Sequence, residues 1–168
     1  GYAEAFSERM QSASSANIAR ARKYVRELEP LGGTNIDEAL EVALKGATGN
    51  KKAPHMIVFL TDGRPTVGES DTQKLLAKVK GHNADGARVF VFGVGDDVNT
   101  LLLDKLAAQH GGSSMYLEDN ASAETELKAF YDRVSHPVLS NLTLDVEGAR
   151  LFGIHPRALP DLFQGGPL

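Results

Sequence analysis

The sequence predicts an α/β fold, in which a doubly wound, mostly parallel sheet carries helices on both faces in a Rossmann-like arrangement. Helical and strand patterns alternate along most of the 168 residues. Two short apolar runs, at residues 55–60 and 87–94, contain β-branched and aromatic residues and are typical of parallel strands covered on both faces. Right-handed crossovers between such strands place the connecting helices against the sheet.

Each expected element has its own signal in the sequence. Polar residues that can cap a helix precede apolar residues at helical spacing, with Ser14 or Ser15 before the first helix and Thr34 or Asn35 before the second. The expected helices lie between Ser14 and Pro30, over residues 36–47, over residues 71–80, between Asn99 and Gly111, and around residues 127–134. The expected strands are residues 2–6, 55–60, 87–94 and 114–118.

The pattern changes from about Pro137 onward. Residues 141–147 alternate leucine and valine with polar residues, which predicts a half-exposed strand, and residues 153–168 are rich in proline and glycine. We therefore expect an α/β domain over residues 1–137 and the start of a β-rich module, or an extended linker, over residues 138–168.

Composition and charge exclude several classes of function. The chain is 42% hydrophobic and 24% charged, which suits one globular domain. No apolar run approaches the ~20 residues of a membrane span, and the N-terminal residues lack the pattern of a signal peptide, so localisation stays unknown at this level. The formal net charge of −4 and the lack of a basic stripe argue against nucleic acid as a partner. Because the chain has no cysteine, disulfides, thiolate metal sites and a cysteine nucleophile are excluded.

Two loops carry the candidate chemistry, because open α/β sheets bind ligands at the carboxyl ends of their strands. In the GGTN loop, Thr34 can either cap the following helix or turn its hydroxyl toward a ligand. In the TDG loop, Asp62 ends an apolar strand and can either open a turn through its own side chain or bind a ligand, with Gly63 allowing close approach. Threonine and aspartate oxygens are ligands suited to Mg²⁺ or Mn²⁺.

The order of the elements, together with these two loops, resembles a von Willebrand factor type A domain of the kind found in inter-alpha-trypsin inhibitor heavy chains and their bacterial relatives. The resemblance covers residues 1–137 and implies a metal-ion-dependent adhesion site. The implied metal ligands are Thr34 and Asp62, and the implied ligand-binding loop consists of Gly32, Gly33, Asn35 and Gly63. The family's other motif, D-x-S-x-S on the first strand, occurs nowhere in this chain. The resemblance therefore implies a domain that is incomplete at its N-terminus and binds Mg²⁺ or Mn²⁺ weakly or not at all on its own.

The same resemblance implies protein recognition and no enzymatic activity. In an intact site the cation would bind a carboxylate of a protein partner, and the expected location is secreted, periplasmic or at the cell surface. It also implies that the strand at residues 55–60 lies at a sheet edge, through which two copies can pair as a homodimer. Two alternatives stay open: a magnesium-dependent phosphoryl-transfer enzyme of another Rossmann-like fold, for which Arg64 is a lone cation, and a metal-free structural interaction domain.

Overall fold

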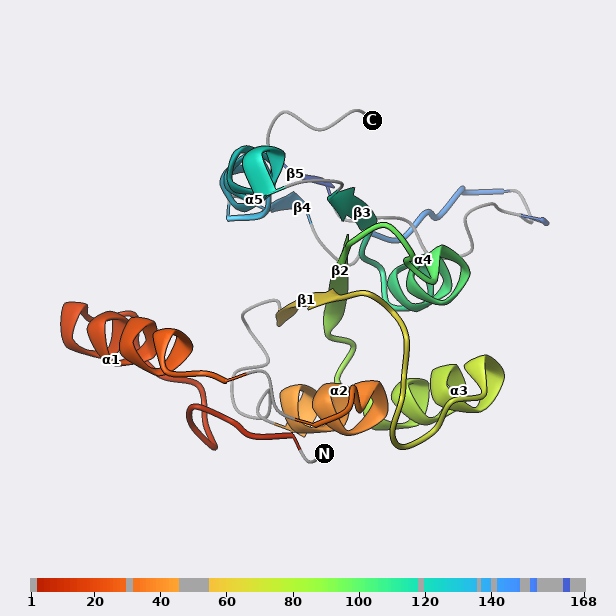
Figure 1. The fold of residues 1–168 in the computed structure, drawn as a ribbon. Coiled ribbons are helices and arrows are strands. Elements are labelled where there is room, and N and C mark those ends of the chain that lie inside the picture. Colours follow the sequence, from red (N-terminus) through yellow and green to blue (C-terminus); the bar gives the residue numbers. More distant parts are fainter. Residues whose placement is uncertain are drawn as a thin grey trace.

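The computed structural model of the protein describes residues 3–29, 32–45, 55–117, 120–135, 137–139, 142–148, 152–153 and 162–163 (Figure 1). In chain order these residues form α1 (Ser15–Arg26), α2 (Ile36–Lys45), β1 (Met56–Thr61), α3 (Thr72–His82), β2 (Arg88–Val94), α4 (Thr100–Gln109), β3 (Ser114–Leu117), α5 (Asn120–Val134), β4 (Pro137–Leu139) and β5 (Leu162–Phe163). Parts of the expected elements, at residues 46–47, 141 and 154–161, lie outside the described residues.

Three parallel strands form the main sheet in the order β1-β2-β3. Val58 of β1 pairs with Phe90 of β2, and Val91 of β2 pairs with Ser114 of β3. Helices lie on both faces of this sheet (Figure 1). The arrangement confirms the predicted α/β class with a parallel sheet, and it places β1 at one edge of the sheet as far as the described residues extend.

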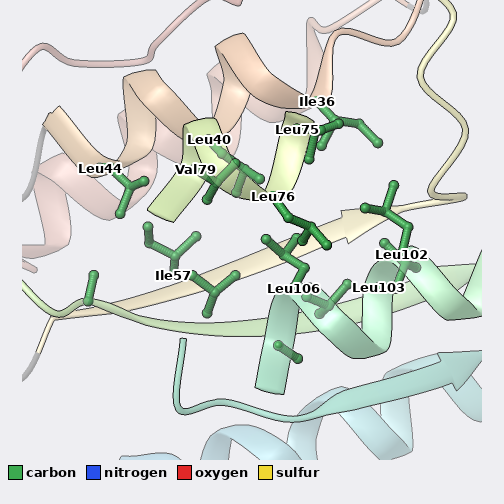
Figure 2. Close-up of a cluster of buried hydrophobic side chains, with 14 residues drawn as sticks. Ile36, Leu40, Leu44, Ile57, Leu75, Leu76, Val79, Leu102, Leu103 and Leu106 are labelled. Carbon is green, nitrogen blue, oxygen red and sulfur yellow. The ribbon is translucent and has the colours of Figure 1, made fainter. Parts of the chain in front are cut away.

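One face of the sheet is covered by α2, α3 and α4, whose apolar side chains form one buried cluster with the strands (Figure 2). Helix α2 contributes Ile36, Leu40 and Leu44, which share one side of the helix because they are spaced by four residues. The other buried members of the cluster are Ile57, Leu75, Leu76, Val79, Ala87, Val89, Val91, Leu102, Leu103, Leu106 and Ala107. The helical spacing of apolar residues that predicts this helix thus corresponds to its buried side.

Helix α5 covers the opposite face over β2 and β3. The ring of Phe130 packs edge to face against Phe90 and Phe92, with centroids 5.0 Å apart in both pairs. The part of this face on β1 is open, since Val58 and Leu60 are 45% and 52% exposed. The prediction that this strand is covered on both faces is therefore wrong for one face, because α5 contacts β3 and leaves Val58 and Leu60 uncovered.

Helix α1 forms where the sequence predicts it but buries none of its side chains. Ser14 caps the helix by accepting a hydrogen bond from the amide of Asn17 at 3.3 Å. The apolar residues Ile18 and Val25 are 41% and 63% exposed. In Figure 1 the helix lies to one side of the sheet, so its apolar stripe has no core partner within the described part of the chain.

Two expected strands do not form in the described residues. Residues 3–6 and 142–146 are irregular, and a segment without a partner strand gains no ladder hydrogen bonds, whatever its pattern of apolar residues. Instead, β4 pairs with β5 in a separate antiparallel sheet. The domain boundary at residue 137 stays a prediction.

Candidate functional site

Asp62 follows β1 at the carboxyl edge of the sheet, as the sequence predicts. Its backbone carbonyl accepts a hydrogen bond from the amide of Asn99 at 3.1 Å, which ties the end of β1 to the start of α4. Its carboxylate Oδ1 accepts from the amide of Arg64 at 3.0 Å and so opens a turn. The second carboxylate oxygen, Oδ2, has no hydrogen-bond partner among the described residues. Asp62 therefore shapes the turn and still has an oxygen available to a ligand.

The loop before α2 shows which residue caps the helix, a role that the sequence allowed for either Thr34 or Asn35. Asn35 caps the helix, because its Oδ1 accepts from the amide of Glu38 at 3.4 Å while its Nδ2 donates to the Glu38 carboxylate at 2.7 Å. Thr34 is therefore not the cap. Its hydroxyl has no hydrogen-bond partner within the residues that the structure describes, so it is available to a ligand.

Hydrogen bonds join the Thr34 loop to the loop that follows Asp62. The amides of Thr66 and Val67 donate to the Thr34 carbonyl at 3.0 and 3.1 Å. In return, the Thr34 amide donates to the Thr66 hydroxyl at 2.8 Å. The structure thus brings together the two loops that carry the expected metal ligands, although the contacts run through Thr66 and Val67, which sequence reasoning did not single out.

The glycines of the expected ligand-binding loop shape these two turns. Gly32 and Gly63 have φ angles of 85° and 73°, a backbone conformation that favours glycine. Gly63 is also packed against Leu103, so that a Cβ at this position would lie 3.0 Å from the Leu103 Cγ. These observations explain why glycine occupies both positions, and direct ligand binding by this loop stays a prediction.

Arg64, the lone cation beside Asp62 in the sequence, is bound to an acidic residue of another loop. Its Nε donates to the carbonyl of Asp97 at 2.8 Å, and its guanidinium forms an ion pair with the Asp97 carboxylate. Both side chains are more than half exposed, so the pair contributes little to stability and acts mainly to align the two loops. Sequence reasoning missed this pair because its members are 33 residues apart in the chain.

The first turn of α2 is anchored beside the site through Asp37. Its carboxylate accepts from the Lys78 Nζ of α3 at 2.8 Å. Desolvation raises the pKa of Asp37, but the hydrogen bond and charge of Lys78, together with bonds from the backbone of Glu69 and Glu38, outweigh it and lower the pKa overall. The carboxylate is therefore held ionised, and it links α2, α3 and the end of the Asp62 loop.

A divalent cation fits these loops by the type of their oxygen atoms. The Thr34 hydroxyl and the Asp62 carboxylate are hard donors, which Mg²⁺ and Mn²⁺ prefer. In the described part of the chain, no group of three or more His, Asp or Glu side chains is arranged to hold a metal ion. Thr34 and Asp62 therefore match the chemistry of the cation without completing its coordination shell.

These features define a class of protein, a Rossmann-like α/β domain whose candidate site lies at the carboxyl edge of a parallel sheet. Within that class, residues 2–116 match the von Willebrand factor type A domain, and the chain belongs to this family.

Curated relatives confirm the type of domain that the sequence resembles. The chain is 33% identical over 164 residues to inter-alpha-trypsin inhibitor heavy chain H2 of Homo sapiens. It is 29% identical over 163 residues to heavy chain H4 of Homo sapiens. The matches cover 94% and 93% of this chain but 17% and 18% of those two relatives. The chain thus spans less than a fifth of the length of the relatives it matches.

Solved structures show the same fold. A von Willebrand factor type A protein from Catenulispora acidiphila has a TM-score of 0.69 at 22% identity, over 79% of this chain and 30% of that chain. An aerotolerance-related membrane protein from Bacteroides fragilis has a TM-score of 0.54 at 20% identity, over 69% of each chain. Within the described residues, no helix has the length and hydropathy needed to cross a membrane.

Proposed function

We propose that this chain is a protein-binding module that uses a metal-ion-dependent adhesion site and catalyses no reaction. One observation carries the proposal. The Thr34 loop and the Asp62 loop are joined by hydrogen bonds, while the Thr34 hydroxyl and one Asp62 carboxylate oxygen stay without a partner among the described residues. Two hard oxygen donors on connected loops at the ligand-binding edge of the sheet support a cation site.

In the proposed mechanism, Thr34 and Asp62 would hold Mg²⁺ or Mn²⁺, which would supply a positive charge for a carboxylate of a protein partner. Neighbouring residues of the chain hold these two side chains in place. Asp62 is fixed by the bonds from Arg64 and Asn99, and Thr34 is fixed by the bonds from Thr66 and Val67. The glycine turns keep side chains away from the approaching partner.

The partner chemistry and the location follow from the same proposal. A cation held by Thr34 and Asp62 would attract a carboxylate-bearing protein ligand, whereas the net charge of −4 does not favour nucleic acid. We place the domain in a secreted, periplasmic or cell-surface setting. Phosphoryl transfer is not proposed, because Arg64, the cation nearest to Asp62 in the sequence, is bound to Asp97.

We also propose that β1 mediates self-association. The strand lies at the edge of the described sheet, and Val58 and Leu60 next to that edge are about half exposed. An apolar edge strand is a template for pairing with another strand, and a second copy of β1 related by a two-fold axis offers the same surface in return.

The metal prediction can be tested by calorimetric titration of the chain with MgCl₂ and MnCl₂. Because Thr34 and Asp62 leave most of an octahedral shell to water, we expect no saturation below roughly the millimolar range. If a strand carrying D-x-S-x-S is joined in front of this chain, to give what we call the full-length protein, we expect binding that Asp62→Ala abolishes and Asp96→Ala, a neighbouring carboxylate at the same edge, leaves intact. Saturable micromolar binding by the chain alone, lost in Asp62→Ala, would mean that its own residues complete the site. A full-length protein that binds neither ion would overturn the metal site and favour a metal-free interaction domain.

A further inference from the structure

A short segment after Asp62, residues 66–69, holds the Thr34 loop in place, and we call it the clasp. Thr66 exchanges hydrogen bonds with Thr34 in both directions, since its amide donates to the Thr34 carbonyl at 3.0 Å and its hydroxyl accepts from the Thr34 amide at 2.8 Å. Val67 adds a second amide bond to the Thr34 carbonyl at 3.1 Å. Both backbone groups of Thr34 are therefore held by the clasp.

The clasp and the Thr34 loop are also packed too closely for side chains at two positions. A Cβ on Gly33 would lie 2.5 Å from the Val67 Cγ2 and 2.6 Å from the Thr66 Oγ1. A Cβ on Gly68, where φ is +79°, would lie 2.4 Å from the Asn35 Oδ1. The absence of these two side chains thus allows the two loops to approach closely at Gly33 and Gly68.

The far end of the clasp is fixed to α2 independently of Thr34. Asp37 accepts a hydrogen bond from the backbone of Glu69, and the same carboxylate is paired with Lys78. Just before the clasp, the Asp62 carboxylate bonds the amide of Arg64. The clasp is therefore held to α2 at Glu69, and at its other end the Thr66 hydroxyl accepts from the Thr34 amide.

We propose that Thr66 is a positioning residue for the cation: it does not bind the ion, but its hydroxyl fixes Thr34 so that the Thr34 and Asp62 oxygens act on one ion. The inference rests on the proposed metal function of Thr34 and Asp62. Thr66 lies four residues after Asp62 in the chain and bonds directly to Thr34. The path from Asp62 along the chain to Thr66, and across this hydrogen bond, is the shortest bonded path to Thr34 that the structure shows. Removing such a partner of a metal ligand typically weakens metal binding by roughly 10–100-fold.

Two variants of similar shape test this role. Thr66→Val removes the hydroxyl and keeps the branched side chain, whereas Thr66→Ser keeps the hydroxyl and removes a methyl group. Affinity for Mn²⁺ alone is measured by electron paramagnetic resonance titration of the full-length protein. We expect Thr66→Val to weaken Mn²⁺ binding by about tenfold or more, and Thr66→Ser to stay within about twofold of the unchanged protein.

A second measurement separates positioning from loss of folding. Amide exchange followed by NMR should show faster exchange of the Thr34 amide in Thr66→Val, with the amides of β1 and β2 unchanged. If the full-length protein binds Mn²⁺ and Thr66→Val binds it equally well, the positioning role is wrong and the metal site stands. If the unchanged protein does not bind Mn²⁺, the proposed metal function fails and the inference fails with it. If Thr66→Ser is as weak as Thr66→Val, the hydroxyl is not the group that matters and the inference is overturned.

Discussion

His110 ends α4 within a buried polar network that fixes its protonation state. The amide of Asn83 is oriented by Ala87, since its Nδ2 donates to the Ala87 carbonyl at 2.8 Å and its Oδ1 accepts from the Ala87 amide at 2.7 Å. The same Nδ2 lies 2.7 Å from the His110 Nδ1, which must therefore accept. The proton of the neutral ring is then on Nε2, which is buried and has no partner among the described residues. A second proton on Nδ1 would face the Asn83 donor.

This geometry predicts that acid destabilises the fold. Burial lowers the pKa of His110 below its ordinary value of 6.5, and the charge of Lys80 lowers it further. Burial lowers the pKa of His55 in the same way, with Asp85 opposing. As the pH falls, the histidines of the unfolded chain therefore take up protons at a higher pH than those of the folded chain. The free energy of unfolding keeps its full value above about pH 6.5 and decreases as the pH drops below that value. The slope is at most about 1.4 kcal/mol per pH unit for each proton. Denaturant melts at a series of pH values measure it.

Two glutamine variants serve as the test and its control. His110→Gln should reduce the slope of stability against pH below about 6.5, leaving the share that belongs to His55. His82→Gln makes the same substitution at a histidine whose side chain is 38% exposed, and it serves as the control for the exchange itself. An unaltered slope in His110→Gln would show that this ring does not control acid sensitivity.

Residue roles with local partners are predictable from sequence, and those with distant partners are not. Asn99 caps α4 where the sequence predicts that helix to begin, and Asp71, expected as the first residue of its helix, caps α3; each accepts from an amide three residues ahead. The bond between Thr34 and Thr66 joins residues 32 positions apart, and no spacing rule indicates it. The helix caps were therefore predictable, and the contacts that hold Thr34 in place were not.

The contrast between α1 and α2 shows how far periodicity predicts an element. Both helices have apolar residues at helical spacing, and both form. Helix α2 buries three of its residues against the sheet, whereas α1 buries none. Periodicity reports that one side of a helix is apolar, and only the arrangement of the neighbouring elements decides whether that side is covered. The same limit applies to β1, whose apolar run did not reveal that one face would be open.

The buried side of α2 gives a test at this scale. Leu40 is fully buried in the cluster between α2, α3 and the sheet (Figure 2). Leu40→Asp places an unpaired carboxylate there and should unfold the domain, at a cost of more than about 4 kcal/mol. Glu41→Ala, one residue further on, removes surface contacts with Lys45 and His82 and should change stability little. Equal effects of the two substitutions in denaturant melts would show that the buried face is assigned wrongly.

At the scale of the whole molecule, the class of fold and the sheet edge at which Asp62 lies were predictable. Alternating elements indicate a parallel sheet, and the carboxyl ends of its strands indicate where Asp62 lies. The exposure of one face of β1 was not predictable, because it depends on how far α5 reaches over the sheet. The isolated helix α1 and the separate pair of β4 and β5 likewise depend on contacts between elements, which local patterns do not encode.

The uncovered face of β1 leads to a prediction about assembly. Val58 is 45% exposed on β1, at the edge of the described sheet, and an apolar edge strand with an uncovered face favours pairing with another strand. We expect the chain of 168 residues to form a dimer or a larger species through this strand. Val58→Lys should weaken association by about tenfold or more, because a charged side chain at an edge opposes pairing. Ile57 is unsuitable for this test, because it is only 8% exposed and its replacement would disturb the core.

Light scattering over a dilution series, with Leu101→Lys as the control, decides whether β1 is the interface. Leu101 is 61% exposed on α4 and is not part of the β1 edge, so this variant adds the same charge at an apolar surface position and should associate like the unchanged chain. If Leu101→Lys and Val58→Lys weaken association equally, charge alone explains the effect and β1 is not the interface. A well-folded monomer at every concentration, with slow amide exchange at residues 56–60, would show that the chain itself covers this edge, and the strand order that places β1 at the edge would then have to be revised.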